Sequence, residues 1–169
     1  MANHCYFEMK IVGKKENVLK MYKYLKADYC YNINGPLKYC TEDKHFFRVF
    51  NACSDNLGEY YDNKDNCYLQ VYGNCAWSVY SCMMSGPGTY CDNYSHIKDA
   101  KFTSLDKVSK ELNLDIEVIS EEPGCEFMEH FLIKQGEILI DECIDFREEY
   151  DEDTDEYERI GGMEYSFSI

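Results

Sequence analysis

The eleven residues from Glu148 to Glu158, EEYDEDTDEYE, contain eight carboxylates and no basic side chain. Carboxylates at this density can bind a metal ion, remain solvated as a tail or helix, or present negative charge to a basic partner. The candidate partner-binding residues in this run are Glu148, Glu149, Asp151, Glu152, Asp153, Asp155 and Glu156.

The spacing of the aspartates tests the calcium alternative. Asp151, Asp153 and Asp155 occupy the first, third and fifth positions of an EF-hand loop. The sixth position requires glycine for a sharp turn but holds Glu156, and the twelfth requires glutamate but holds Gly162. The calcium motif fails at both positions, which leaves a solvated segment or a binding surface.

The charge of the whole chain favours a basic partner. The 169 residues include 17 basic and 32 acidic side chains, giving a formal net charge of -15. Nucleic-acid binding depends on Lys and Arg displacing counterions, and so negative a surface repels phosphates over a Debye length of roughly 8 to 10 Å. We therefore expect no direct binding to nucleic acid.

Ten cysteines and four histidines raise the possibility of metal or thiol chemistry. The chain has no C-x-x-C pair, and the one combination that could converge on zinc is Cys40, His45 and Cys53. Cysteines more often fill apolar positions, and no local signature marks a Cys nucleophile with a His base. We expect free thiols, no metal and no cofactor.

Three other motifs have a structural reading beside the functional one. The pair Glu121 and Glu122 could perform acid-base chemistry or end a strand, and we retain both as candidate partner-binding residues. The loop SGPGTY lacks the G-K-[ST] ending of a phosphate-binding loop. The aromatic run HFFRVF, 45–50, resembles an RNA-stacking strand, but with Arg48 as its only clearly basic member it is expected to pack in the core.

Tyrosine is abundant, with sixteen in the chain. Several lie in turn-rich segments, where exposed rings would suit a protein interface, although they could equally pack the insertion that contains them. We take Tyr60 and Tyr61 as candidate partner-binding residues.

Hydrophobic periodicity predicts the elements that position these residues. A strand that ends at Gly13 alternates, with Cys5, Phe7, Met9 and Ile11 on one face. A helix follows over 15–27 with one apolar stripe of Val18, Met21, Tyr22 and Leu25, and an insertion at about 28–66 carries one strand. Two strands, 68–72 and 76–83, would turn at Gly73-Asn74. After them the pattern predicts a helix over 103–113 with Thr103 as N-cap, a strand over 114–120, and a hairpin turning near Gln135-Gly136.

This order predicts an α+β fold of the ferredoxin-like split βαβ type, an antiparallel sheet with two helices on one face and a C-terminal β-hairpin. The expected domains are 1–144, which includes the insertion, and an acidic C-terminal segment, 145–169. No apolar run approaches the roughly 18 to 20 residues that cross a bilayer, and the opening lacks secretory-signal features. We expect a soluble cytoplasmic protein that does not bind membranes.

Three segments resemble the YubB ferredoxin-like domain family of phage and plasmid proteins: MANHCYFEMKIVGKKENVLKMYKYL, CAWSVYSCM around Trp77, and LDIEVISEEPGCEFMEHFLIKQGE. The most specific part is EEPGCEF, with the acidic pair, glycine and aromatic that the family has after its fourth core strand. His4 stands where a second tryptophan is usual, and the insertion and acidic segment are departures. The resemblance implies a ferredoxin-like fold and a mobile-element origin, and transfers no catalytic role to Glu121, Glu122 or Trp77.

These observations together predict a non-enzymatic inhibitor. It would bind a basic, nucleic-acid-handling protein of a bacterial host, such as a Cas effector, and block its nucleic-acid site, which makes anti-CRISPR activity one expected class. The alternatives are a structural or regulatory protein-binding module and a metal- or thiol-dependent enzyme.

Overall fold

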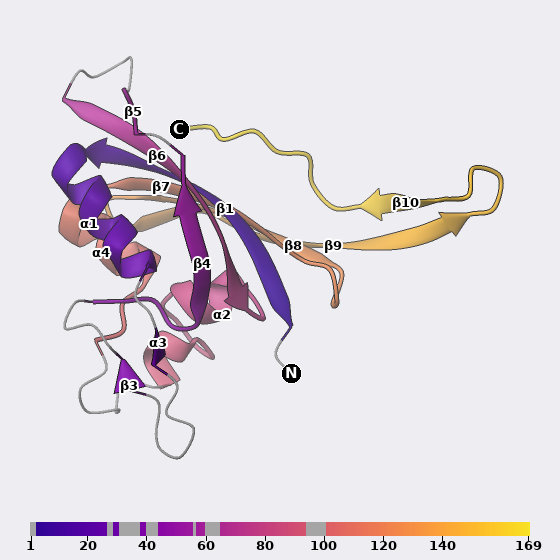
Figure 1. Cartoon of the computed structure of the whole chain (residues 1–169), viewed down its shortest axis with the longest axis horizontal. Helices are drawn as coiled ribbons and strands as arrows, with labels where there is room; N and C mark the ends of the chain where they lie inside the picture. The colour runs from indigo at the N-terminus through magenta and orange to yellow at the C-terminus, as the bar shows by residue number, and fades with distance from the viewer. Residues whose placement is uncertain are drawn as a thin grey trace.

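The computed structural model describes residues 3–26, 29–30, 38–39, 44–55, 57–59, 65–93 and 101–169. The main body is one antiparallel sheet with the strand order β10-β9-β8-β7-β1-β6-β4, and β5 also pairs with β6 (Figure 1). The strands of this sheet are β1 (His4–Lys14), β4 (Val49–Ser54), β5 (Gly58–Glu59), β6 (Asn66–Ala76), β7 (Asp115–Glu122), β8 (Phe127–Lys134), β9 (Glu137–Asp151) and β10 (Glu156–Gly161). A separate antiparallel pair consists of β2 (Tyr29–Cys30) and β3 (Lys38–Tyr39).

Helices α1 and α4 lie side by side next to the sheet, and their apolar side chains join one core with it (Figure 1). The helices described are α1 (Lys15–Leu25), α2 (Val79–Met83), α3 (Tyr90–Asn93) and α4 (Leu105–Leu112). The prediction of an α+β protein with an antiparallel sheet is confirmed, and the sheet is larger than the predicted layout required.

Strand β1 follows its predicted alternation. Cys5, Phe7, Met9 and Ile11 are buried, whereas Tyr6 is exposed. Because successive side chains of a strand point to opposite faces, β1 has one face in the core with the helices and a second face, the open face, on the other side. This periodicity determines which side chains of β1 point to the open face.

Helix α1 also matches its predicted stripe. Val18, Met21 and Leu25 are buried and Tyr22 packs partly against the core, while Tyr24 is a buried addition to the stripe. Residues three and four apart share one face of a helix, so the lysines of α1 remain on the other side.

The prediction of two strands joined by a turn at Gly73-Asn74 is wrong. Strand β6 continues through both residues to Ala76 and pairs with β1 along its whole length, with Gly73 opposite Phe7. A Cβ at Gly73 would lie 2.6 Å from the Phe7 ring, so this glycine leaves room for a cross-strand aromatic ring rather than making a turn. The predicted strand 76–83 instead contains α2.

Helix α2 depends on a residue distant in sequence. Glu129 on β8 is buried, and its carboxylate accepts hydrogen bonds from the backbone N–H of Val79 at 2.8 Å and of Tyr80 at 3.1 Å, and from the Ser120 hydroxyl at 2.6 Å. Free N–H groups at a helix start require such acceptors. Burial raises the pKa of Glu129, although these hydrogen bonds act in the opposite direction.

Helix α4 begins later than predicted. Ser104 rather than Thr103 occupies the N-cap position, and the Ser104 side chain makes no capping hydrogen bond. Asp106 accepts hydrogen bonds from the backbone N–H and the hydroxyl of Ser85. The carboxylate therefore holds the loop after α2 instead of closing a capping box.

The hairpin predicted near Gln135-Gly136 is confirmed between β8 and β9, with positive φ angles of 52° and 85° at the two turn residues. The predicted domain boundary after residue 144 falls inside β9, which runs without interruption to Asp151. The expectation of one strand in the insertion is wrong: β2, β3, β4 and β5 all lie within 28–66, and β4 and β5 join the main sheet beside β6. None of the helices in the described ranges is long and apolar enough to span a membrane.

Candidate functional site

The acidic run forms a hairpin that projects from the body of the molecule (Figure 1). Strand β8 pairs with β9 only as far as Asp145, so from Phe146 onward the strand paired with β9 is β10. We call residues 146–161 the arm. The segment is therefore neither a free tail nor a helix but an exposed hairpin, and both a solvated segment and a binding surface remain compatible with it.

The turn of the arm is built by its own aspartates. Asp151 accepts hydrogen bonds from the backbone N–H of Asp153 at 2.9 Å and from the Thr154 hydroxyl at 3.1 Å. Asp155 takes a positive φ of 59°, and its N–H donates to the Asp151 carbonyl. Asp tolerates positive φ and stabilises turns through its side chain. Asp151 and Asp155 therefore stabilise the turn of the arm.

One face of the arm carries a tyrosine pair. Tyr150 and Tyr157 are opposite each other, with ring centroids 5.2 Å apart and exposed fractions of 49% and 70%. The Tyr150 hydroxyl donates a hydrogen bond to Asp155, and this bond raises the pKa of Tyr150. Exposed tyrosine rings supply contact area at small entropic cost, which suits an interface.

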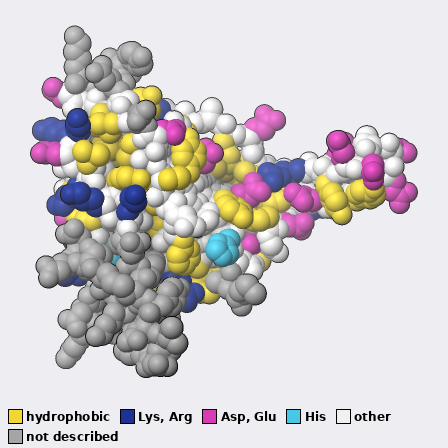
Figure 2. Space-filling model, in the orientation of Figure 1, with side chains coloured by type: hydrophobic (Ala, Val, Ile, Leu, Met, Phe, Trp, Pro, Cys, Tyr) yellow, Lys and Arg dark blue, Asp and Glu magenta, His cyan; other side chains and the backbone are white. Residues whose placement is uncertain are grey.

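The other face of the arm carries carboxylates in direct opposition. The register places Glu149 opposite Glu158 and Asp151 opposite Glu156. Like charges directly opposite each other destabilise an antiparallel pair. Figure 2 shows the acidic side chains gathered along the arm. Of these four carboxylates, Asp151 also builds the turn and Glu149 forms an ion pair with Arg147 at 2.7 Å, whereas Glu156 and Glu158 make no hydrogen bond or ion pair with the described residues.

The arm is held to the body by Arg159. Its guanidinium contacts both carboxylate oxygens of Glu121 at 2.6 and 3.0 Å and lies 4.3 Å from the centre of the Phe146 ring. A weaker contact to Glu148 lies at 4.0 Å. Arg159 and the tyrosine pair share one face of the arm, because register positions two apart point the same way. That face is therefore continuous with the face of the sheet that Glu121 occupies.

The structure separates the two glutamates at the end of β7. Glu121 is partly exposed beside Arg159, whereas Glu122 is 2% exposed and accepts hydrogen bonds from the backbone N–H groups of Gly124 and Cys125. Glu122 closes the turn between β7 and β8, which corrects the expectation that it faces a partner. Adjacent residues on a strand point to opposite faces, so this divergence was foreseeable.

The seven acidic residues predicted in the run all belong to the arm or its turn, and Glu121 lies at its base. Tyr60 and Tyr61 lie outside the described residues. The sequence interpretation missed Tyr150, Tyr157 and Arg159. The signal that could have found the tyrosines is their symmetrical placement on either side of the polar turn DEDTD, which is a hairpin pattern.

A second missed feature is the segment 162–169, which we call the strap. It follows β10 and runs from the base of the arm back over the sheet (Figure 1). The buried Glu117 carboxylate accepts hydrogen bonds from the Ser168 backbone N–H at 2.6 Å, the Ser168 hydroxyl at 3.0 Å and the Ile169 N–H at 3.1 Å. His130 Nε2 lies 2.8 Å from the same carboxylate. Ile169 packs with Val12 and Leu132. Glu117 thus fixes the strap on the sheet.

The cysteines whose side chains the structure describes carry free thiols: Cys5, Cys53, Cys67, Cys75, Cys82, Cys91, Cys125 and Cys143. Burial raises the pKa of Cys67, Cys75 and Cys143, and an interaction with Glu122 raises that of Cys125. A raised pKa reduces the thiolate fraction that nucleophilic chemistry requires. Across the described part of the chain, no three His, Cys, Asp or Glu side chains converge to hold a metal ion. Cys40, from the predicted zinc combination, lies outside it.

The comparisons with known proteins give no assignment: no family model, no curated protein and no solved structure matches this chain.

Proposed function

We propose that this protein is a non-enzymatic inhibitor which binds a basic, nucleic-acid-handling protein of a bacterial host through the arm and thereby blocks the nucleic-acid site of that protein. The proposed setting is the cytoplasm of the host, the proposed origin is a mobile element, and a Cas effector is one partner class that fits. The arm would occupy the groove in which the phosphates of the nucleic acid otherwise lie.

The observation that carries the proposal is the set of opposed carboxylates on two rungs of the arm, Glu149 with Glu158 and Asp151 with Glu156. Like charges opposite each other repel. Among the described residues only Glu149 of these four has an ion-pair partner, Arg147 at 2.7 Å, so a cationic groove would relieve the repulsion that remains. Charge of this kind mainly accelerates encounter, whereas aromatic anchors determine how long a complex lasts. The exposed Tyr150–Tyr157 pair on the opposite face provides such anchors.

The topology of the body supports the finer fold assignment that we propose with it. Strands β1, β4, β6 and β7 are adjacent in the order β7-β1-β6-β4, with α1 between β1 and β4 and α4 between β6 and β7 along the chain. This is the strand–helix–strand–strand–helix–strand succession of a ferredoxin-like split βαβ unit. Strands β8, β9 and β10 would then be an extension that carries the arm. Because the fold hosts many functions, the arm and not the fold supports the inhibitor assignment.

The test is capture from a bacterial lysate with three immobilised baits. The first is the wild type, and the second carries Glu152→Gln, Glu156→Gln and Glu158→Gln, whose side chains make no hydrogen bond or ion pair with the described residues. The third carries the same charge change on the body, at exposed positions: Glu16→Gln, Glu137→Gln and Asp141→Asn.

The proposal expects the wild-type and body-variant baits to retain a nucleic-acid-binding protein that the arm variant loses and that excess duplex DNA or RNA elutes. Equal retention by all three baits would contradict a role for the arm. Retention that depends on the arm but resists nucleic acid would favour the alternative, a regulatory protein-binding module whose main contact is the tyrosine pair.

A further inference from the structure

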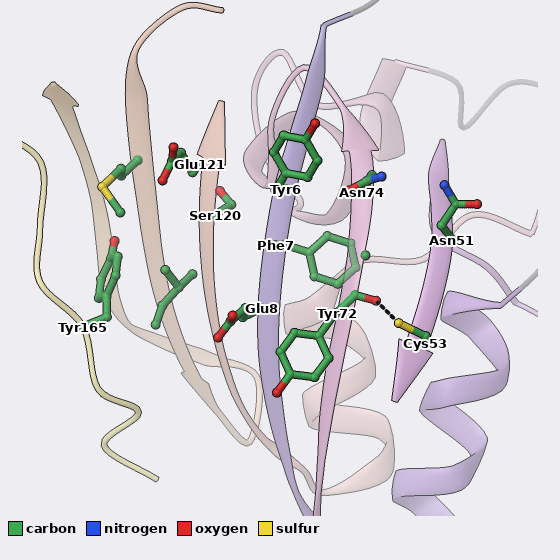
Figure 3. Close-up of a pocket in the computed structure, with 13 residues that line it drawn as sticks. Tyr6, Phe7, Glu8, Asn51, Cys53, Tyr72, Asn74, Ser120, Glu121 and Tyr165 are labelled. Carbon is green, nitrogen blue, oxygen red and sulfur yellow. Dashed lines mark hydrogen bonds between the residues drawn. The ribbon is translucent and has the colours of Figure 1, made fainter. Parts of the chain in front are cut away.

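The open face of the sheet contains a cavity of about 550 Å³. Strands β4, β6, β1 and β7 form its floor, and Tyr165 of the strap stands at one side (Figure 3). A volume of this size accommodates a small molecule or a large side chain rather than a whole domain. The occupant must therefore be small or be the side chain of a larger partner.

The register explains the chemistry of the cavity floor. Tyr6 on β1 lies between Asn74 on β6 and Glu121 on β7, and Glu8 lies between Tyr72 on β6 and Ile119 on β7. Carboxylates, amides and aromatic rings thus alternate over two rungs of the sheet (Figure 3). Tyr6 is 55% exposed, so its ring is open to a ligand.

The electrostatics of the cavity favour a cation. The described lining includes two carboxylates, Glu8 and Glu121, and no lysine or arginine. Arg159 already pairs with Glu121, so Glu8 is the carboxylate left for a ligand. The Tyr72 hydroxyl donates to Asp55 at 3.1 Å, which brings a third carboxylate to the rim. Burial raises the pKa of Tyr72, and the hydrogen bond to Asp55 and the charges of Asp55 and Glu8 raise it further. An anionic ligand would meet repulsion here.

Two basic side chains of the protein itself, Arg159 and Lys10, already lie against aromatic rings on the same face. Arg159 joins a carboxylate, Glu121, with an aromatic ring, Phe146. Lys10 lies 5.1 Å from the centre of the Tyr68 ring. Glu8 offers the same combination beside Tyr6 and Tyr72, and in the described part of the chain no basic side chain forms an ion pair with it.

We propose that the cavity receives an arginine side chain of the basic partner, with the guanidinium at Glu8 and against the rings of Tyr6 and Tyr72. Arginine fits better than lysine because its planar group stacks on rings while donating to carboxylates and amides, and its apolar stem can lie along Ile119. This inference rests on the proposed function. The tyrosine face of the arm is continuous with the open face, so one partner could contact the arm and the cavity together.

The experiment is an NMR titration of the full chain with a blocked arginine-rich peptide, and with lysine-rich and citrulline-rich peptides of equal length. We expect saturable shifts at Tyr6, Glu8 and Tyr72, affinity about threefold or more lower for the lysine peptide, and no saturation with citrulline. Glu8→Gln should weaken binding of the arginine peptide at the cavity by about tenfold. The matched variant Glu16→Gln, at an exposed position of α1, should not.

Tyr6→Leu provides a second variant at an exposed position, where folding is not at risk, and should also weaken the cavity shifts. Shifts confined to the arm, or equal effects of Glu8→Gln and Glu16→Gln, would overturn the cavity assignment and leave the proposed function standing. Cavity shifts with the expected variant effects, together with equal lysate capture by all three baits, would instead contradict the proposed function.

Discussion

The two halves of strand β9 differ in the strand that they pair with. From Glu137 to Asp145 the strand pairs with β8, whose Phe131 and Ile133 belong to the main core. From Phe146 to Asp151 it pairs with β10 in a ribbon, where two rungs oppose carboxylates. A two-stranded ribbon is marginal by itself, and opposed like charges weaken it further. Pairing with β8 at the edge of the packed sheet supports the first half, whose own side chains are exposed or half-buried. The second half is anchored by Phe146, the one buried side chain of β9, and beyond it pairs only with β10.

The largest expected effect is a difference in the free energy of unfolding between substitutions of two isoleucines, one in the body and one in the arm. Ile116 is fully buried on β7 and Ile160 is 40% exposed on the arm. Ile116→Ala should lower the free energy of unfolding by about 2–5 kcal/mol, because it removes apolar contacts and leaves a cavity. Ile160→Ala should change it by less than about 0.5 kcal/mol. Urea unfolding curves of the two variants measure both values, and similar losses would contradict the division between body and arm.

The next effect concerns the strap. Glu117→Ala removes the acceptor for the Ser168 and Ile169 N–H groups and should cost about 1.5–3 kcal/mol, the range for hydrogen bonds to a charged group. Hydrogen exchange should then accelerate in the strap before it changes in β1. A control variant, Glu137→Gln at the exposed start of β9, should leave exchange in the strap unaltered. Unchanged strap protection in Glu117→Ala would show that the apolar contacts of Ile169 suffice.

A pH-dependent effect is expected from Glu129. Because burial raises its pKa, the stability it contributes is fully present below its ordinary value of 4.5 and is lost as pH rises through the raised value in the folded state. Wild type should therefore lose stability relative to Glu129→Gln as pH increases over that window. Unfolding free energies of both proteins, measured from below pH 4.5 to neutrality, provide the difference, and a difference that does not vary with pH would contradict the assignment.

The smallest effect tests the opposed charges directly. Glu158→Gln relieves the repulsion with Glu149 and should stabilise the arm by about 0.2–1 kcal/mol. Glu137→Gln, on the body half of β9 opposite Lys134, removes an opposite-charge pairing and should not stabilise. Hydrogen exchange of the Tyr150 and Tyr157 amides reports the change. Faster exchange in Glu158→Gln would mean that the carboxylates stabilise the arm.

The sequence predicted those elements whose conformation depends on residues close together in the chain. The alternation of β1, the stripe of α1 and the turn at Gln135-Gly136 each depend on neighbouring residues. Gly73-Asn74 has the composition of a turn, but the ring of Phe7 on another strand determines its conformation. Helix α2 requires Glu129, which lies 50 residues beyond Val79 along the chain.

The candidate site was predicted in composition but not in shape. Asp and Glu have low strand propensity, so the composition of the acidic run does not indicate paired strands, and the placement of Tyr150 and Tyr157 around DEDTD is the one hairpin signal in it. Its pairing becomes visible only from the turn built by Asp151 and from Arg159, which reaches Glu121. The cavity was not predictable because Tyr6, Glu8 and Tyr72 come together only through the register of β1 with β6.

The most direct test of the central claim is the association rate of the captured partner with wild type, with the arm variant (Glu152→Gln, Glu156→Gln, Glu158→Gln) and with the body variant (Glu16→Gln, Glu137→Gln, Asp141→Asn), measured at low and at physiological salt. We predict that the arm variant associates about tenfold more slowly at low salt, with a flatter salt dependence, and that the body variant stays close to wild type. Equal rates and equal salt dependence for the arm and body variants would contradict the claim that the charge of the arm recruits the partner.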